Sequence, residues 1–429
     1  MIALIALLAV QAPRNSGDSL TLADAIGLGR SRAVAVTLAR LGARVADARA
    51  GQRRSEILPN VSAGGVTSRQ TKNLDEFGIP FASGVTDPFT VFSFQLRASQ
   101  TVFDPAAFGR LKAAKDSVIA AGLDVETAGL LAGTTAGIAF LRAVSAEETV
   151  LARDADSVVA ARLLRGAEEQ LKAGVTPAID LTRTQVYFSS IRAQLAVARN
   201  LRARARLDLF RSLDFPSDTA VVLSRALADD RAGLPSSAAE ATRFGLEHRS
   251  DLEAERQRLA VMRRARSAIR AENLPSVVAS GAYIESGQDA GKLKGSYVAQ
   301  LGVALPIWDG FRRQLRSREQ GLRIEAQELR VRDLEHQIDT DARQAMLDLA
   351  TAREQAALAE ERGQLADREL RQAEERFKAG VAGSLETVTA QAGLVSARDA
   401  VIQGRVGLAL ARVNAFRALG VIDQLRSTP

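Results

Sequence analysis

The feature that most constrains the fold of this chain is an internal repeat with an offset of 206 residues. Residues 170–181 read QLKAGVTPAIDL, and residues 376–387 read RFKAGVAGSLET. A second pair of matching segments, the Leu-Pro at 58–59 and at 274–275, has an offset of 216. Solenoid repeats are only roughly 20–50 residues long. The offset therefore indicates a domain-sized unit that has been duplicated.

Composition restricts what the duplicated unit can be. Only 4% of the 429 residues are aromatic, and Ala, Leu, Val, Arg and Glu dominate, which is typical of long packed helices. The chain has no cysteine, so disulfides, thiolate metal sites and cysteine catalysis are excluded. The net charge of +7 is spread over helices that also carry 50 acidic residues, which indicates solvated faces and no nucleic-acid partner.

Hydrophobic periodicity predicts very long helices in both copies. One heptad row in the first copy contains Leu111, Val118 and Val125, and a second row contains Leu123 and Leu130. The two rows lie on opposite faces, because a helix turns by about 200° in two residues. A helix with two apolar seams packs against a neighbour on each side, as in the wall of a cylinder. We expect long helices at 105–173 and 310–379, return helices at 179–212 and 385–418, and leading helices at 21–58 and 237–274.

Segments with a period of two interrupt the helical pattern once in each copy. Phe92, Phe94 and Leu96 alternate with polar residues, which predicts a strand with one apolar and one polar face. The predicted strands are 61–69, 90–102, 277–285 and 297–306. Strands of this length cross a bilayer when tilted, but four strands cannot close a barrel, and open edges are not viable in lipid. Three copies would supply twelve strands, within the range of outer-membrane barrels.

The remaining segments divide the chain. The apolar run at 1–12 is typical of a secretory signal peptide and is too short to span a bilayer. The first repeat then occupies 13–215, an equatorial linker 216–236, the second repeat 237–420 and a tail 421–429. The fold class is thus mainly α with a β-barrel portion, built from a duplicated long α-hairpin and strand pair.

Taken together, these motifs resemble those of the TolC-type outer-membrane efflux proteins over essentially the whole chain. The motifs are the paired Lys-Ala-Gly-Val turns, the Leu-Pro before each first strand, and the Phe-Asp-Pro at 103–105 matched by the Trp-Asp-Gly at 308–310. The resemblance implies a homotrimer with a twelve-stranded barrel in outer-membrane lipid and a twelve-helix periplasmic cylinder. It implies a passive exit duct for efflux or secretion, joined to an inner-membrane transporter by a periplasmic adaptor. The alternatives are a periplasmic adaptor and a soluble coiled-coil protein.

The resemblance also assigns roles to residues near the turns. It assigns adaptor contact at the helical tips to Gly174, Val175, Thr176, Gly380, Val381 and Ala382. Asp180 and Glu386 stand at matching positions after the turns, where the family's closed aperture lies, although an acid there also stabilises a helix dipole. Phe377 and Ala382 replace the tyrosine and arginine of the best-known gate network, so those polar links cannot form.

Four aromatic residues and a glycine row complete the predictions. Phe103, Tyr283, Tyr297 and Trp308 are expected at the membrane interfaces. The glycines at 129, 133 and 137 form a GxxxGxxxG row, which predicts that another helix approaches closely. Both histidines, His248 and His336, are interpreted as structural. We identify no catalytic arrangement, metal site or cofactor site in the sequence.

Overall fold

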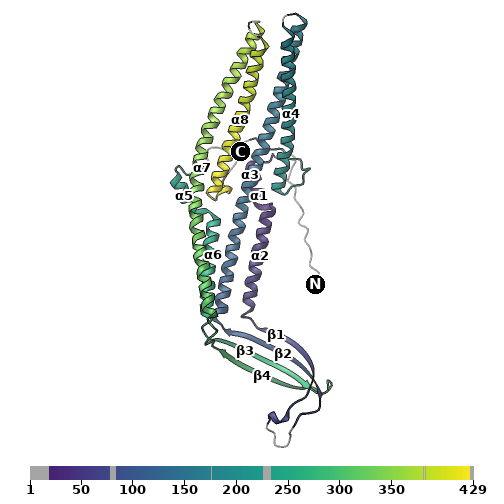
Figure 1. The fold of residues 1–429 in the computed structure, drawn as a ribbon, viewed down its shortest axis with the longest axis vertical. Coiled ribbons are helices and arrows are strands. Elements are labelled where there is room, and N and C mark those ends of the chain that lie inside the picture. Colours follow the sequence, from purple (N-terminus) through teal and green to yellow (C-terminus); the bar gives the residue numbers. More distant parts are fainter. Residues whose placement is uncertain are drawn as a thin grey trace. The chain divides into compact units, whose positions relative to one another are not determined.

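The computed structural model describes residues 19–77, 84–174, 176–225, 233–379, 381 and 383–425. The predicted signal peptide at 1–12 lies outside the described residues. Figure 1 shows the helices and strands of the chain, which divides into two compact units. The hairpin unit comprises Met1–Arg40, Asp124–Leu252 and Asp333–Pro429, and the sheet unit comprises Leu41–Leu123 and Glu253–Arg332. Each unit thus takes segments from both sequence repeats.

The sheet unit contains one antiparallel sheet in the order β1-β2-β3-β4. Its strands are β1 (Asn60–Gln70), β2 (Phe89–Phe103), β3 (Ser276–Gly287) and β4 (Lys294–Ala304). The predicted pairing within each copy is observed, and the pairing of β2 with β3 joins the two copies. Leu96 lies opposite Ala63 and Tyr283, and Tyr283 lies opposite Tyr297. Since side chains alternate along a strand, these residues share one largely apolar face.

In each copy a long helix and then a return helix follow the strands along the chain. The two long helices are α3 (Pro105–Lys172) and α7 (Arg312–Lys378), and the return helices are α4 (Ala178–Leu213) and α8 (Ser384–Ala418). The long helices contain 68 and 67 residues and the return helices 36 and 35, close to the predicted lengths. The absence of proline inside them removes the usual cause of a break.

Each leading helix is interrupted, so the prediction of single helices at 21–58 and 237–274 is wrong. The first consists of α1 (Leu22–Arg32) and α2 (Val34–Ser55), and the second of α5 (Ala238–His248) and α6 (Ser250–Ala271). The single residues between them, Ala33 and Arg249, have ψ angles of 139° and 117°, which are extended. Apolar residues keep a helical spacing across each break, so the sequence pattern does not reveal it.

The two breaks have the same construction. The N–H groups of Ala33 and Arg249 still donate to the carbonyls of Gly29 and Gly245, and these glycines are related by the offset of 216. The Arg249 guanidinium holds the second break by donating to Asp251 and Asp341 at 2.6 and 2.9 Å. Burial opposes its charge, but these two carboxylates more than compensate and raise the pKa of Arg249.

The core of the hairpin unit lies where α1, α3, α4 and α8 meet. Phe140, Leu209, Leu213 and Val413 are fully buried there. The linker joins this core through Leu223, which forms a parallel bridge with Leu20. Among the described residues, α3 is the one helix long and apolar enough to cross a membrane by length and composition. Half of its most apolar window is buried in the protein, so packing accounts for this composition.

The glycine row on α3 allows α1 to pack closely against it, which confirms the predicted approach of another helix. A Cβ at Gly133 would lie 2.7 Å from the Arg30 Cγ and 3.2 Å from the Ile26 carbonyl oxygen. On the facing helix, a Cβ at Gly29 would lie 2.6 Å from the Ala136 Cβ. Glycine on both helices therefore allows their backbones to approach closely.

Alanine at Gly29 is expected to destabilise the hairpin unit by about 1–3 kcal/mol, because the new methyl group overpacks a backbone contact. Gly27 provides the matched control in the same helix, since nothing lies within 4 Å of a Cβ there. Gly27→Ala should instead stabilise the helix by up to about 1 kcal/mol. Thermal unfolding of the two variants in detergent, followed by circular dichroism, tests the difference. Equal unfolding midpoints would show that the close approach of α1 and α3 does not affect the stability of the hairpin unit.

Candidate channel sites at the helical tips and the membrane collar

The first helical tip is a short turn between α3 and α4. Gly174 has a φ of +70° in this turn, and its N–H donates to the Leu171 carbonyl at 3.0 Å. Such a left-handed residue is a common way to end a helix and favours glycine. Thr176 follows in the same turn. Val175, also predicted to contact an adaptor, lies outside the described residues.

The second tip connects α7 to α8. Val381 is 66% exposed, and its N–H donates to the Arg376 carbonyl at 3.1 Å. The other predicted contact residues here, Gly380 and Ala382, lie outside the described part of the chain. Beyond the turns, Ile179 and Leu385 are 53% and 57% exposed and are related by the offset of 206. Each tip therefore carries exposed apolar surface in one protomer.

The two predicted aperture acids have different environments. Asp180 is buried in the first turn of α4 and accepts a hydrogen bond of 2.5 Å from the Ser384 hydroxyl. Glu386, in the first turn of α8, has a side chain that is 45% exposed and forms an ion pair of 2.9 Å with Arg376. Part of the difference follows from the repeat, because Ala178 stands where the second copy has Ser384 and has no hydroxyl to donate to Glu386.

A buried polar seam between α4 and α8 continues from these acids. Gln391 is fully buried, and its side chain lies next to the Tyr187 phenol. The Thr387 hydroxyl, one turn earlier on α8, is buried without a hydrogen-bond partner among the described residues. Burial raises the pKa of the Tyr187 phenol to about 12, and the charge of Asp156 adds to this shift. This phenol is therefore neutral at physiological pH.

Asp156 is the centre of a buried ionic network that joins the two copies. Its carboxylate is fully buried and pairs with Arg153 at 2.7 Å and with Arg398 at 2.9 Å. Arg153 also pairs with Asp399 on α8. Sequence reasoning missed this network, because charged residues within a long helix are ordinarily solvated. The repeat contained only a weak signal, the matching of Arg192 with Arg398.

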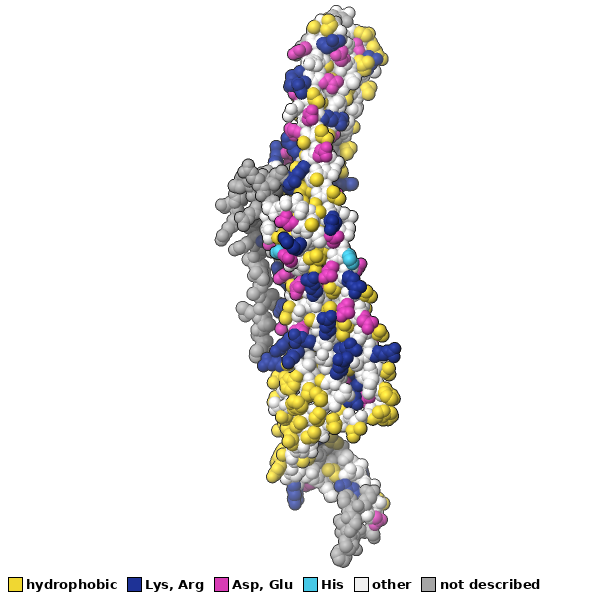
Figure 2. Space-filling view, turned by 90° about the vertical axis from the view of Figure 1, so that its left-hand side faces the viewer, with side chains coloured by type: hydrophobic (Ala, Val, Ile, Leu, Met, Phe, Trp, Pro, Cys, Tyr) yellow, Lys and Arg dark blue, Asp and Glu magenta, His cyan; other side chains and the backbone are white. Residues whose placement is uncertain are grey.

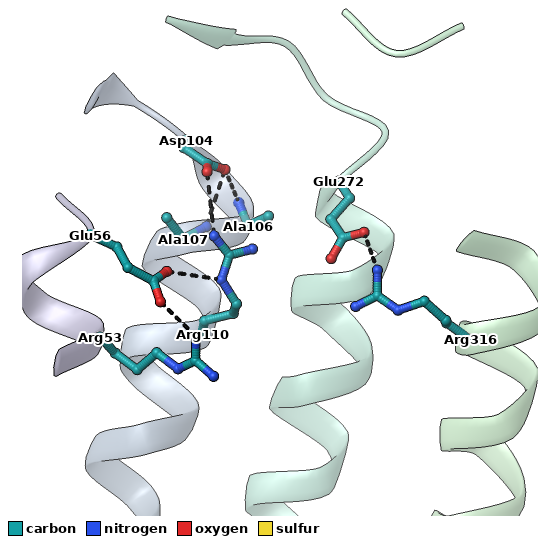
Figure 3. Close-up of polar contacts among 8 residues, drawn as sticks. All are labelled: Arg53, Glu56, Asp104, Ala106, Ala107, Arg110, Glu272 and Arg316. Atoms are coloured by element: carbon teal, nitrogen blue, oxygen red, sulfur yellow. Dashed lines mark hydrogen bonds and ion pairs between the residues drawn. The ribbon is translucent and has the colours of Figure 1, made fainter. Parts of the chain in front are cut away.

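A second set of ion pairs forms a collar where the helices meet the sheet (Figure 3). Arg110 of α3 pairs with Glu56 at 3.2 Å, and Arg316 of α7 pairs with Glu272 at 2.7 Å. The two pairs are copies of each other, since both the acids and the arginines match under the repeat offsets. Burial opposes ionisation of Glu56, but hydrogen bonds from Arg53 and Arg110 outweigh it and lower the pKa.

The acid that follows each second strand begins the next long helix. The Asp104 carboxylate accepts the N–H groups of Ala106 and Ala107 at 2.9 and 3.1 Å (Figure 3). The Asp309 carboxylate accepts the N–H and the Nε–H of Arg313 at 3.1 and 2.7 Å. An acid at this position satisfies free backbone donors and favours the helix dipole. The Phe-Asp-Pro and Trp-Asp-Gly motifs thus fix the change from strand to helix.

The four predicted interface aromatics all lie in or next to the sheet. Phe103 ends β2, Tyr283 and Tyr297 are opposite each other on β3 and β4, and Trp308 follows β4. Their exposed fractions are 47%, 50%, 84% and 77%. Hydrophobic side chains gather on one face over the sheet, and Lys and Arg side chains gather over the adjoining helix ends (Figure 2). This pattern is typical of a protein surface that passes from lipid to water.

A bilayer-length sheet with two open edges, joined to duplicated helical hairpins, defines one subunit of an oligomeric outer-membrane channel. The family model described as "Outer membrane efflux protein" matches residues 27–213 and 245–421. The chain belongs to this family. A comparison with curated protein sequences finds no match.

Solved outer-membrane channels share the fold. The Campylobacter jejuni CmeC channel is 18% identical with a TM-score of 0.79, over 93% of this chain and 85% of that one. Vibrio cholerae VceC is 15% identical with a TM-score of 0.79, over 93% and 96%. The open-state Neisseria gonorrhoeae MtrE channel is 20% identical with a TM-score of 0.73, over 93% and 88%. At these identities the likeness establishes the fold, a helical tunnel with a β-barrel.

Family membership confirms several predictions made from the sequence. The protein is an outer-membrane channel for efflux or secretion and extends into the periplasm. Channels of this family are homotrimeric, work with an adaptor and a pump, and are not a family of enzymes. The adaptor and coiled-coil alternatives are not favoured, because the match extends over both strand pairs and both hairpins.

Proposed function

We propose that a trimer of this chain is a passive exit duct whose helical tips are engaged by a periplasmic adaptor, itself coupled to an inner-membrane transporter. The observation that carries the proposal is the exposed apolar surface at both tips, which includes Ile179, Val381 and Leu385. Exposed apolar groups at the end of a long hairpin favour a partner that covers them. Val175, Gly380 and Ala382 complete the proposed contact surface.

We also propose that the aperture of the channel lies at the level of the helical tips. Asp180 and Glu386 each stand six residues after the turn glycines, so three copies would bring up to six carboxylates together. Like charges at a constriction focus negative potential and favour cations. The hydrogen bond from Ser384 to Asp180 links the start of α4 to the start of α8. Phe377 and Ala382 stand at the family's gate positions and cannot form the polar links of the best-known gate network. The hydrogen bond between Ser384 and Asp180 offers a polar link between the two hairpins in their place.

A single cysteine tests the adaptor contact directly, because the chain has no other. Val381→Cys, treated in intact cells with a short bifunctional thiol-to-amine reagent, is expected to cross-link to a periplasmic protein with a helical hairpin. Mass spectrometry of the cross-linked species identifies the partner. Val186→Cys, an exposed position on α4, serves as the control and should give less than about a tenth of this product if contact is confined to the tips. Products containing only copies of this chain would overturn the assignment.

A further inference from the structure

We propose that a basic groove between the end of α6 and the start of α7 binds the phosphate of an anionic phospholipid in the periplasmic leaflet of the outer membrane. The groove has a volume of about 490 Å³ and is lined by four arginines, Arg266, Arg270, Arg313 and Arg318. Among the residues that line it, Glu325 is the one acid. The groove lies entirely within the sheet unit.

Three of the four arginines are available to a ligand. Arg313 is engaged: it pairs with Asp309 at 2.7 Å and donates to the carbonyls of Glu272 and Pro306 at 3.1 and 3.3 Å. No ion pair is formed by Arg266, Arg270 or Arg318 with any described residue. An arginine guanidinium presents several donors in a planar fork that matches phosphate oxygens. The groove therefore contains one arginine that is held in place, Arg313, and three arginines whose guanidinium groups can bind a phosphate.

Arg266 shows that the groove is built for an acceptor. Its Nε is buried and has no hydrogen-bond partner among the described residues, which is costly for a charged donor. Its guanidinium lies against Gly321, where a Cβ would be 3.2 Å from the Nη2 atom. A glycine inside a helix is unfavourable, and here its missing side chain leaves room for the Arg266 guanidinium. A phosphate oxygen in the groove would satisfy the free donor.

The duplicated unit provides an internal comparison. At the offset of 216, Arg266 corresponds to Ala50, and at the offset of 206, Gly321 corresponds to Lys115. The collar pairs, by contrast, are present in both copies. Arg266 and the glycine beneath it are therefore not requirements of the shared fold. The first copy keeps basic residues at other counterpart positions, Arg54, Lys112 and Lys115, but it lacks this pair.

The position of the groove selects a lipid as the source of the phosphate. α6 ends at Ala271 and β3 begins at Ser276, so the groove is next to the strands that cross the membrane. Ile307 and Trp308, just before α7, are 91% and 77% exposed, as expected for side chains at the headgroup level. The helices extend into the periplasm, so this end of the sheet faces the inner leaflet. Basic pockets at such a level bind anionic headgroups.

The test is a lipid titration of the delipidated trimer, measured by native mass spectrometry. Dioleoyl phosphatidylglycerol is expected to bind in preference to dioleoyl phosphatidylcholine, with up to one preferred lipid per subunit. Arg266→Gln and Arg318→Gln should each weaken phosphatidylglycerol binding about fivefold, corresponding to about 1 kcal/mol for each arginine near a membrane surface. Arg54→Gln is the matched control, because Arg54 is the first-copy counterpart of Arg270.

Three outcomes would overturn the proposal. One is equal binding of the two lipids, and another is an equal loss in Arg54→Gln, which would indicate general surface charge. The third is binding of inorganic phosphate as tightly as phosphatidylglycerol, which would make this a site for the free ion. Single-channel conductance of the same variants should not change. A negative lipid result therefore leaves the channel function untouched, and Arg318, which is exposed, keeps the test independent of any folding defect in Arg266→Gln.

Discussion

Replacement of Asp156 by alanine is expected to lower the free energy of local opening of the hairpin unit by about 3–5 kcal/mol. The carboxylate is fully buried between Arg153 and Arg398, and the Arg153 side chain is only 7% exposed. Removing the acid leaves a buried guanidinium with Asp399 as its remaining partner. Arg153 would keep one of its two carboxylate partners, so its buried charge would be only partly compensated, which costs more than the loss of an exposed ion pair. The loss should appear in α3, α4 and α8 together, because the network joins the two copies.

Amide hydrogen exchange of the trimer, followed by mass spectrometry, reports local opening free energies and so tests this prediction. The control is Asp154→Ala, two residues away on the same helix. Asp154 pairs with Arg199 at 3.0 Å, but both side chains are about half exposed, so its removal should cost less than about 1 kcal/mol. If the two variants exchange alike around residue 156, the buried network does not stabilise the hairpins.

Glutamine at Glu386 is expected to weaken block by multivalent cations about tenfold and to reduce cation selectivity, with trimer assembly unchanged. The Glu386 side chain is accessible and its ion pair with Arg376 is exposed, so its charge is available to ions. Asp180 is buried and accepts a hydrogen bond from Ser384, so Asp180→Asn should have the smaller effect on selectivity. Planar-bilayer recordings under a salt gradient measure both quantities.

Arg376→Gln is the informative partner variant for Glu386. Removal of the paired cation should increase cation selectivity, opposite in sign to the effect of Glu386→Gln. A general disturbance of the tip would instead change the cation selectivity of both variants in the same direction. A reversal potential and a block that are unchanged in Glu386→Gln would show that this carboxylate does not line the pore.

Most of the fold could be predicted from the sequence, because the periodicities that carry it are long. A helix of 68 residues with two apolar seams and a strand with strict alternation each have one structural interpretation. The breaks at Ala33 and Arg249 could not be predicted in the same way. Apolar spacing persists on both sides of each break, and the only cue was a glycine four residues earlier in each copy.

The candidate sites were less predictable, because the sequence does not say which charged residues are buried. Asp156 and Arg153 resemble ordinary surface residues of a long helix, and only tertiary packing removes them from water. The repeat also implied that Asp180 and Glu386 are equivalent. Their surroundings differ because the neighbours are not repeated: Ser384, which donates to Asp180, has Ala178 as its counterpart, and Arg376, which pairs with Glu386, has Gln170. Duplication preserves backbone positions better than it preserves side-chain environments.

The order of strands in the sheet has a consequence for inheritance. β1 and β4 are the two edges, so the edge of one subunit must be completed by the opposite edge of the next before any ring can close. A defective β4 edge therefore disables every assembly that incorporates it. In a cell that makes equal amounts of intact and defective subunits, only about one trimer in eight would be wholly intact. Alleles damaged at this edge should thus be dominant, whereas alleles that prevent synthesis of the chain should be recessive.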